Sequence, residues 1–299
     1  MESNRYERGK YCVKVKTSSK MTRIPILTYH SHRVLGSTYE TNDHIALFHD
    51  LRTLHAYGFR VAPLNRIVEW FLGIRDEISG NCTAITFDDG CDLDWIDYDH
   101  PQYGFIKSFS AVLEEFQHEL GGNQPYVQAS SFVIGSPAAR RFISAKSFPG
   151  MDLLNDHWWK SAEASGFLRI YNHSWDHNHA AVHVTCQKDN LKGSFENIDT
   201  FQECECEIDQ SAIFIAEKIY PNWPDLFAYP YGPSSDYVRK IYFPQFIEHH
   251  RTLAAFGASG GYLTKGSFRW NLPRLVSGAC PPAGWRTKDE FMEILNGAK

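Results

Sequence analysis

The chain has 299 residues, 43% of them hydrophobic, and a formal net charge of -5 at neutral pH. This length suits one large α/β domain, and the apolar fraction is ordinary for a globular protein with a sizeable core. The sequence has no Lys/Arg run, which argues against nucleic acid as a partner, and no apolar run of about 18 residues, which argues against a membrane span.

The N-terminal segment and the cysteines bear on organisation and compartment. Residues 1–22 are predicted to be a polar arm, and residues 23–299 a single domain. The arm lacks the apolar segment of a secretory signal, so we expect a cytoplasmic protein, or an extracytoplasmic one if a signal has been removed. The seven cysteines, an odd number, favour a reducing compartment. We interpret Cys204 and Cys206 as two half-buried thiols on a helix. The oligomeric state is not predicted.

Strands and helices are expected to alternate from residue 24 onward, beginning with an apolar strand at 24–29. Leucines at helical spacing predict the next helix, with Thr41 as its cap and Gly58 at its end. Thr287 and Glu290 fit a capping box that opens a terminal helix. The other expected elements are helices at 64–72, 109–118, 156–165 and 201–219, and strands at 82–87, 127–134, 168–171, 226–229, 252–256 and 268–276. Such alternation indicates a mostly parallel sheet.

Residues 91–110 form an unusual acidic and aromatic loop. A calcium site is one interpretation of its aspartates, although their spacing does not match an EF-hand. We favour a loop on the substrate side of the site, whose aromatic rings pack or stack on sugar. The residues concerned are Asp92, Asp94, Asp97, Asp99, Trp95, Tyr98 and Tyr103.

Two short polar motifs follow predicted strands. Residues 86–90 read Thr-Phe-Asp-Asp-Gly, and residues 173–177 read His-Ser-Trp-Asp-His. Two histidines four residues apart can reach one cation, and an aspartate from elsewhere completes a three-ligand set with an open position for water. The second aspartate of the pair is then available as a base beside that water. Each motif alone has a plain alternative, a solvated loop or a strand-end turn, but the combination is more specific.

These motifs resemble the first two motifs of the NodB-homology polysaccharide deacetylases, carbohydrate esterase family 4. Residues 227–232, Phe-Ala-Tyr-Pro-Tyr-Gly, resemble the family's Arg-x-Pro-Tyr segment. Residues 25–30, which end in Tyr-His, and Leu-Pro-Arg at 272–274 resemble segments of the poly-N-acetylglucosamine deacetylase branch. The resemblance implies an α/β fold, namely an irregular (β/α) barrel of about seven parallel strands, with the motifs at the C-terminal ends of the strands.

The resemblance also implies a metal site. Asp89, His173 and His177 would bind a divalent cation, with Zn²⁺ expected and Ni²⁺ or Co²⁺ as alternatives. Asp88 would be the general base that takes a proton from the metal-bound water. Adjacent strand residues point to opposite faces, so both aspartates can serve one site only if the strand ends there, and Gly90 permits the bend.

Amide hydrolysis needs two further groups. The backbone N–H of Tyr231 would donate to the tetrahedral oxyanion. The larger family places its acid, a histidine, late in the chain, but here no histidine follows His250. The branch with an N-terminal Tyr-His uses that histidine, which is His30 in this chain. His32 is the competing candidate.

The chain departs from the family pattern in two places. Ala228 replaces the arginine of the third motif, and Arg274 is expected to hold the base instead, because a guanidinium fork can contact a carboxylate twice. The family's Asp-x-x-Asp-Trp motif is not evident, and Arg269-Trp270 is the candidate for the apolar wall that receives the acetyl methyl.

The predicted function is metal-dependent hydrolysis of N-acetyl groups on an amino-sugar polysaccharide or oligosaccharide. The alternatives are an O-acetyl esterase or a small-amide hydrolase on the same fold, or a catalytically inactive carbohydrate-binding protein. The intact metal and base positions argue against the inactive alternative. The sequence names neither the glycan nor the native metal.

Overall fold

The computed structural model describes residues 22–299 except 79, 149 and 183–192, so the arm predicted at 1–22 lies outside the described residues, apart from Thr22. The strands are β1 (Ile26–Tyr29), β2 (Arg60–Val61), β3 (Cys82–Phe87), β4 (Tyr98–His100), β5 (Gly104–Ile106), β6 (Ala129–Val133), β7 (Leu168–Asn172), β8 (Leu226–Ala228), β9 (Ala254–Phe256), β10 (Leu275–Ser277) and β11 (Gly284–Trp285). The α-helices are α1 (Asp43–Ala56), α2 (Leu64–Phe71), α3 (Phe109–Leu120), α4 (Pro137–Ser147), α5 (Trp159–Ser165), α6 (Phe201–Cys204), α7 (Ser211–Ile219), α8 (Phe243–Gln245), α9 (Ile247–His250) and α10 (Lys288–Ala298). Two π-helical segments are η4 (Glu205–Gln210) and η5 (Val238–Tyr242).

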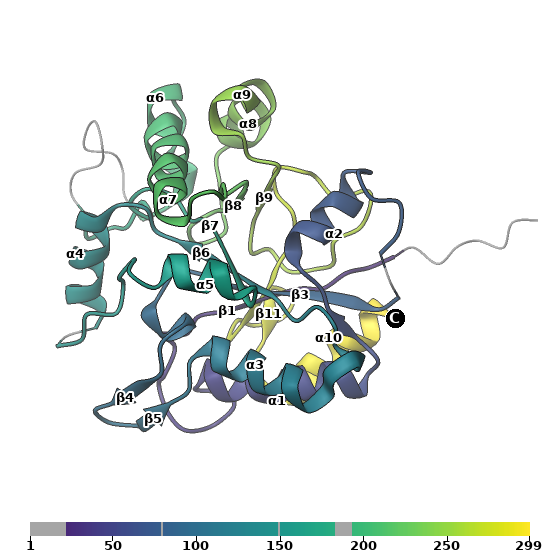
Figure 1. Ribbon diagram of the computed structural model, residues 1–299. Helices are drawn as coiled ribbons and strands as arrows, with labels where there is room; N and C mark the ends of the chain where they lie inside the picture. Colours follow the sequence, from purple (N-terminus) through teal and green to yellow (C-terminus); the bar gives the residue numbers. More distant parts are fainter. Residues whose placement is uncertain (1–21, 79, 149, 183–192) are drawn as a thin grey trace, which may run out of the picture.

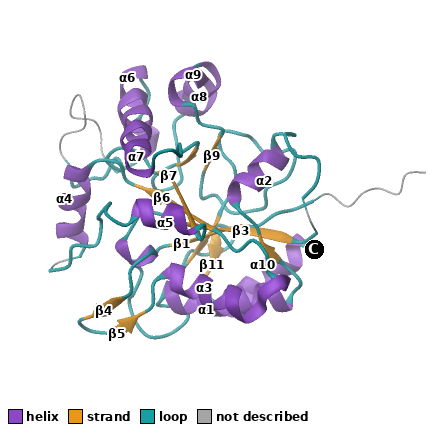
Figure 2. Cartoon of the chain, in the orientation of Figure 1, coloured by secondary structure: helices purple, strands orange, loops and turns teal. Residues whose placement is uncertain are grey.

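The main sheet is parallel at every strand pairing, with the order β11-β10-β1-β3-β6-β7-β8-β9 and β2 added beside β3. β2 and β11 have two residues each, and the other seven strands of this sheet match the number that the resemblance implied. Helices lie around the strands (Figure 1; Figure 2). The prediction of an α/β barrel with parallel strands is confirmed. The hairpin β4–β5 is antiparallel, and so are two isolated bridges among the described residues, Ile24–Leu263 and Val34–Asn42.

An irregular seam joins the two ends of this sheet. The segment just before β10 runs beside β9, where Leu272 pairs in parallel with Phe256. The N–H of Leu272 donates to the carbonyl of Ala255 at 2.8 Å, and the N–H of Gly257 donates to the carbonyl of Leu272 at 2.9 Å. The strand expected at 268–276 is therefore regular only at its end. Its first part closes the barrel through single bridges, which gives the barrel its irregular shape.

The two faces of the sheet contact different clusters. Leu27 and Ile85 belong to the cluster that includes side chains of α1, α3, α5 and α10. Ile26 and Ala84, one residue earlier on each strand, belong to a second cluster with side chains from β6, β7, β8 and β9. Because alternate strand residues point to opposite faces, this second face is the inside of the barrel. The next inward positions on β1 and β3 are Thr28 and Thr86, whose hydroxyls lie 2.9 Å apart.

Helix boundaries follow the capping side chains. The cap of α1 is Asn42, whose side chain accepts from the N–H of His44 at 2.9 Å, so the prediction of Thr41 was one residue off. The capping box of Thr287 and Glu290 is confirmed at α10. The helix expected at 201–219 is continuous, but its middle part is π-helical. None of the described helices has both the length and the apolar content to cross a membrane.

The acidic loop at 91–110 is built into the fold. Asp92 accepts from the N–H of Asn155 and from the indole of Trp158. Asp97 accepts from the N–H and hydroxyl of Ser108, which caps α3. Asp94 accepts from Ser31 at 2.5 Å and from Ser131 at 2.7 Å. These carboxylates satisfy protein donors, so the calcium interpretation has no support in the part of the chain that the structure describes.

The cysteine interpretation is partly wrong. Cys204 is a free thiol, as expected, but it is fully buried, and Cys206 is disulfide-bonded. An odd number of scattered cysteines gives no spacing that would have revealed this bond.

Candidate active site

The predicted site residues converge at the C-terminal edge of the barrel. All seven line one cavity of about 400 Å³. His30 follows β1, Asp88 and Asp89 follow β3, His173 and His177 follow β7, Tyr231 follows β8, and Arg274 directly precedes β10. The structure therefore brings together residues that lie up to 244 positions apart in the chain, although their catalytic roles stay predictions.

Strand alternation directs His30 and Asp88 toward the same place. β1 and β3 pair with Thr28 opposite Thr86. His30 and Asp88 each lie two residues further along, so they continue the inward-facing rows of these strands. The N–H of Asp88 donates to the carbonyl of Tyr29 at 3.3 Å and keeps the two strands together at this edge.

The chain turns sharply at Asp89. Asp89 has φ 76° and Gly90 has φ 69°, both in the left-handed region. A Cβ on Gly90 would come within 2.7 Å of Val133 Cγ1, so only glycine fits between this turn and β6. The turn directs Asp89 into the cavity that Asp88 already faces, which is the bend expected from the sequence.

The two histidines of the second motif lie on a tight loop. Ser174 and His177 have positive φ values of 69° and 63°. The N–H of His177 donates to the hydroxyl of Ser174 at 2.9 Å. The N–H groups of Trp175 and Asp176 both lie 3.2 Å from Oε2 of Glu207 on η4. These contacts fold residues 173–177 so that both rings face Asp89.

Among the described residues, Asp89, His173 and His177 form the single group of side chains whose geometry could hold a metal ion. Oδ1 of Asp89 lies 3.1 Å from Nε2 of His177 and 3.6 Å from Nε2 of His173. Nδ1 of His173 lies 2.9 Å from the carbonyl of Ala228, so the ring hydrogen is on Nδ1 and the Nε2 lone pair faces Asp89.

Charge and protonation at these side chains suit a cation. Burial lowers the pKa of His173 to about 4, which leaves a neutral imidazole, the form that binds metals. Burial raises the pKa of Asp89, but His177, His32 and His30 outweigh it and hold this pKa well below its ordinary value. One carboxylate and two imidazoles fit a divalent ion such as zinc and leave a coordination position open.

Asp88 is held by Arg274. The guanidinium contacts both carboxylate oxygens, with Nη1 at 2.7 Å from Oδ1 and Nη2 at 2.8 Å from Oδ2. Nε of Arg274 donates to the carbonyl of Gly257 at 3.0 Å, which fixes the fork. Burial raises the pKa of Asp88, but Arg274 and His173 bring it below its ordinary value. The contact expected of Arg274 from the sequence is present.

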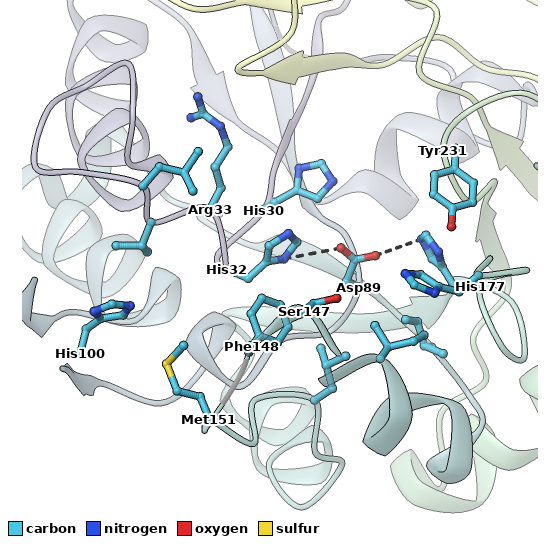
Figure 3. Close-up of a pocket in the computed structure, with 16 residues that line it drawn as sticks. His30, His32, Arg33, Asp89, His100, Ser147, Phe148, Met151, His177 and Tyr231 are labelled. Atoms are coloured by element: carbon cyan, nitrogen blue, oxygen red, sulfur yellow. Dashed lines mark ion pairs between the residues drawn. The ribbon is translucent and has the colours of Figure 1, made fainter. Parts of the chain in front are cut away.

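His30 and His32 lie side by side at the rim, with ring centroids 5.5 Å apart. The N–H of His30 donates to Asp43 at 2.9 Å. Nδ1 of His32 lies 3.5 Å from Oδ2 of Asp89, and burial lowers the pKa of His32 (Figure 3). The contact of His32 with Asp89, the predicted metal ligand, was not foreseen, because the sequence alone does not show where a side chain in the loop after a strand points.

Tyr231 and Trp270 have different outcomes. Tyr231 has a positive φ of 63°. Its ring packs edge-on against the ring of His177, with the ring centroids 4.6 Å apart, and Figure 3 shows both residues at one end of the site. Trp270 stacks on Phe243 in a separate cluster and does not line the site, so the apolar wall expected from Arg269-Trp270 is wrong. The aliphatic side chains that line this cavity are Ala258, Val276 and Ala279.

An α/β barrel with a carboxylate and imidazole cluster at the C-terminal ends of its strands has the architecture of a barrel enzyme. The particular family follows from sequence comparison. A family model described as "Polysaccharide deacetylase" matches residues 75–243, more than half of the chain, so the protein belongs to the polysaccharide deacetylase family. The resemblance to this family is confirmed, and with it a deacetylase activity on carbohydrate as the class of function. A search of curated proteins finds no significant match.

Several solved structures share this fold. The Streptococcus pyogenes deacetylase PplD in complex with acetate is similar with a TM-score of 0.61 and 15% identity, covering 94% of this chain and 100% of that one. IcaB from Ammonifex degensii has a TM-score of 0.60 and 16% identity over 93% and 97% of the two chains. A de-N-acetylase from Aggregatibacter actinomycetemcomitans has a TM-score of 0.57 and 16% identity over 90% and 99%. At such identities the likeness shows the fold.

Proposed function

We propose that the protein is a metal-dependent hydrolase that removes N-acetyl groups from an amino-sugar glycan. The observation that carries the proposal is the group of Asp89, His173 and His177 beside Asp88, a carboxylate that Arg274 holds in two contacts. Asp89, His173 and His177 would hold the cation. A cation bound there would lower the pKa of water and polarise the acetyl carbonyl.

The remaining steps belong to side chains and backbone of this chain. Asp88, ionised beside Arg274, takes a proton from the attacking water at a carboxylate oxygen. The N–H of Tyr231 donates to the oxygen that becomes negative as water adds to the carbonyl carbon. His30 gives a proton to the amide nitrogen as the C–N bond breaks. Water and amide thereby become acetate and a free amine.

N-acetyl substrates are favoured over O-acetyl ones by the two histidines at the rim. An amine leaves only after it is protonated, and His30 and His32 both line the cavity beside Asp89. The name of one structural neighbour, a de-N-acetylase, agrees with this choice. Hydrolysis of an activated ester would not need a protonated histidine, because its leaving group departs as an anion.

Acetate release is the test. Protein purified without chelator is analysed for metal, then incubated with N-acetylated chito-oligosaccharides and with O-acetylated xylo-oligosaccharides. The proposal expects about one divalent ion per chain and acetate chiefly from the N-acetylated sugars. Acetate from the O-acetylated sugars alone would make the protein an esterase, and metal without any acetate would favour an inactive carbohydrate-binding protein.

A further inference from the structure

A second cavity of about 560 Å³ opens directly beside the candidate site. It shares His30, His32, Asp89, His177 and Tyr231 with the catalytic cavity. Figure 3 shows that it continues past His32, away from Tyr231 and His177, toward Phe148 and Met151. A group attached to a substrate near its reacting carbonyl would therefore reach this space.

The far end of this cavity, here called the apolar chamber, is lined by hydrocarbon. Its residues come from the loop after β1, from the end of β6, from α4 and from the segment after α4. Most of them also belong to, or pack against, a hydrophobic cluster that is separate from the barrel interior. They are Val34, Leu35, Ile134, Ile143, Phe148, Met151 and Leu154.

Two polar side chains beside the apolar chamber, Arg33 and His100, already have partners. The guanidinium of Arg33 lies 2.7 Å from Asp43 and also donates to the carbonyl of Glu40. Nδ1 of His100 accepts from the N–H groups of two residues in the β4–β5 turn, at 3.1 and 3.2 Å. A sugar placed there would lose hydrogen bonds to water that these groups do not replace, and buried unpaired hydroxyls are costly.

We propose that the apolar chamber binds a hydrocarbon group that the substrate carries beside its scissile amide. This inference rests on the proposed function and specifies its substrate class. The hydrocarbon has two sources: an acyl chain longer than acetyl, which would take the place of the acetyl group in the proposed function, or an apolar group linked to an N-acetylated amino sugar. In both cases its first carbon atoms pass His32 and Phe148, whose ring centroids lie 5.3 Å apart. These two rings form the entrance to the apolar chamber and set its selectivity.

The two sources are separated by two substrate series. The first varies the acyl group of glucosamine from acetyl through butyryl to octanoyl. The second keeps N-acetylglucosamine and compares its methyl and octyl glycosides, below the concentration at which octyl chains form micelles. Full burial raises kcat/KM by about fourfold for each methylene. We expect an increase of at least about tenfold across one series. Flat or falling values in both series would overturn the inference.

Variants test whether the apolar chamber causes this preference. Met151→Glu places a charge on its wall, and Phe148→Ala removes one side of its entrance. Both should reduce the ratio of kcat/KM for the long-chain substrate to that for the acetyl or methyl one by about tenfold. Phe142→Ala is the matched control, since Phe142 lies on α4, is 40% exposed and does not line the cavity. An unchanged ratio in both chamber variants would count against the inference.

A binding measurement separates this inference from the proposed function. Asp88→Asn protein, which should not turn over, is titrated by calorimetry with the methyl and octyl glycosides and with N-acetyl- and N-octanoylglucosamine. Tighter binding of an eight-carbon ligand, lost in Met151→Glu, supports the apolar chamber even if no amide is hydrolysed. Hydrolysis of acetyl substrates with equal binding of short and long ligands would keep the proposed function and overturn the apolar chamber.

Discussion

Arg274 and Asp88, which lie 186 positions apart in the sequence, form a buried two-contact ion pair. Arg274 lies at the end of the seam that closes the barrel, and its Nε is bound to the carbonyl of Gly257 next to β9. The closure of the barrel and the orientation of the proposed base therefore depend on the same side chain.

Replacing Arg274 should damage both stability and turnover. Arg274→Ala leaves a buried carboxylate without its partner, which costs roughly 3–5 kcal/mol of unfolding free energy. Arg274→Lys keeps the positive charge but loses the two-contact guanidinium geometry, so losses of stability and turnover smaller than those of Arg274→Ala are expected. Urea unfolding and acetate release measure both effects. Arg75→Ala is the control, because Arg75 pairs with Glu69 on the surface and should change either quantity little. Equal behaviour of the Arg274 and Arg75 variants would contradict this account.

Metal content should depend on His177. His177→Ala removes one of three ligands, so protein purified without chelator should contain much less than one equivalent of metal. His118→Ala, on the exposed face of α3, should keep it. Elemental analysis of both proteins measures the metal content. Full metal occupancy in His177→Ala would mean that the metal is bound by another set of ligands.

Asp88→Asn should separate metal binding from chemistry. The amide does not accept a proton from water, so turnover should fall by at least about 100-fold while the metal content stays the same. A metal-replete Asp88→Asn protein with near-normal acetate release would assign the base to another group.

The sequence predicted that these side chains would gather, because Asp88, Asp89 and His173 directly follow strands, and strand ends of a parallel barrel share one edge. The roles of ligand and base came from the resemblance to the family and stay predictions. The sequence predicted Arg274 only through the resemblance to a family, since nothing local shows that Leu272-Pro273-Arg274 closes the barrel. Trp270 was misplaced because an aromatic residue near the motifs packs equally well in a core. The role of Glu207 in bracing the histidine loop had no local signal, because it depends on a π-helical segment packing against that loop.

His250 should make folding sensitive to acid. It is buried, its Nε2 donates to the carbonyl of Phe243 at 3.0 Å, and its Nδ1 accepts from the N–H of Thr252 at 2.9 Å. The contact with Thr252 needs the neutral ring, because a protonated Nδ1 cannot accept a hydrogen bond. Burial lowers the pKa of His250 to about 4. The unfolded chain binds a proton near pH 6.5, so this stabilisation is complete above that pH and is lost as the pH falls toward 4.

The expected loss from this one group is about 3 kcal/mol over that range. His250→Gln does not titrate, so its unfolding free energy should vary less with pH than that of the unmodified protein. The comparison uses urea unfolding at several pH values between 7 and 4. His118→Gln, an exposed replacement, should leave the pH profile unchanged. Parallel profiles for the unmodified and His250→Gln proteins would remove His250 as the cause.

The prediction that His30 is the general acid is the easiest of these to disprove. His30 is placed by strand alternation on the inward row that also leads to Asp88. His32 lies two residues further along the chain, in the loop, and contacts Asp89. The acid must protonate the amine nitrogen, because amines leave poorly as anions. An activated ester such as 4-nitrophenyl acetate needs that proton much less.

His30→Ala should therefore reduce amide cleavage by about 100-fold or more, reduce cleavage of 4-nitrophenyl acetate far less, and leave metal content unchanged. His32→Ala is the matched comparison, since both rings line the same cavity. If His32 serves only to orient Asp89, its loss should change amide and ester cleavage by similar factors. A selective loss of amide cleavage in His32→Ala, together with equal losses in His30→Ala, would transfer the proton donor from His30 to His32.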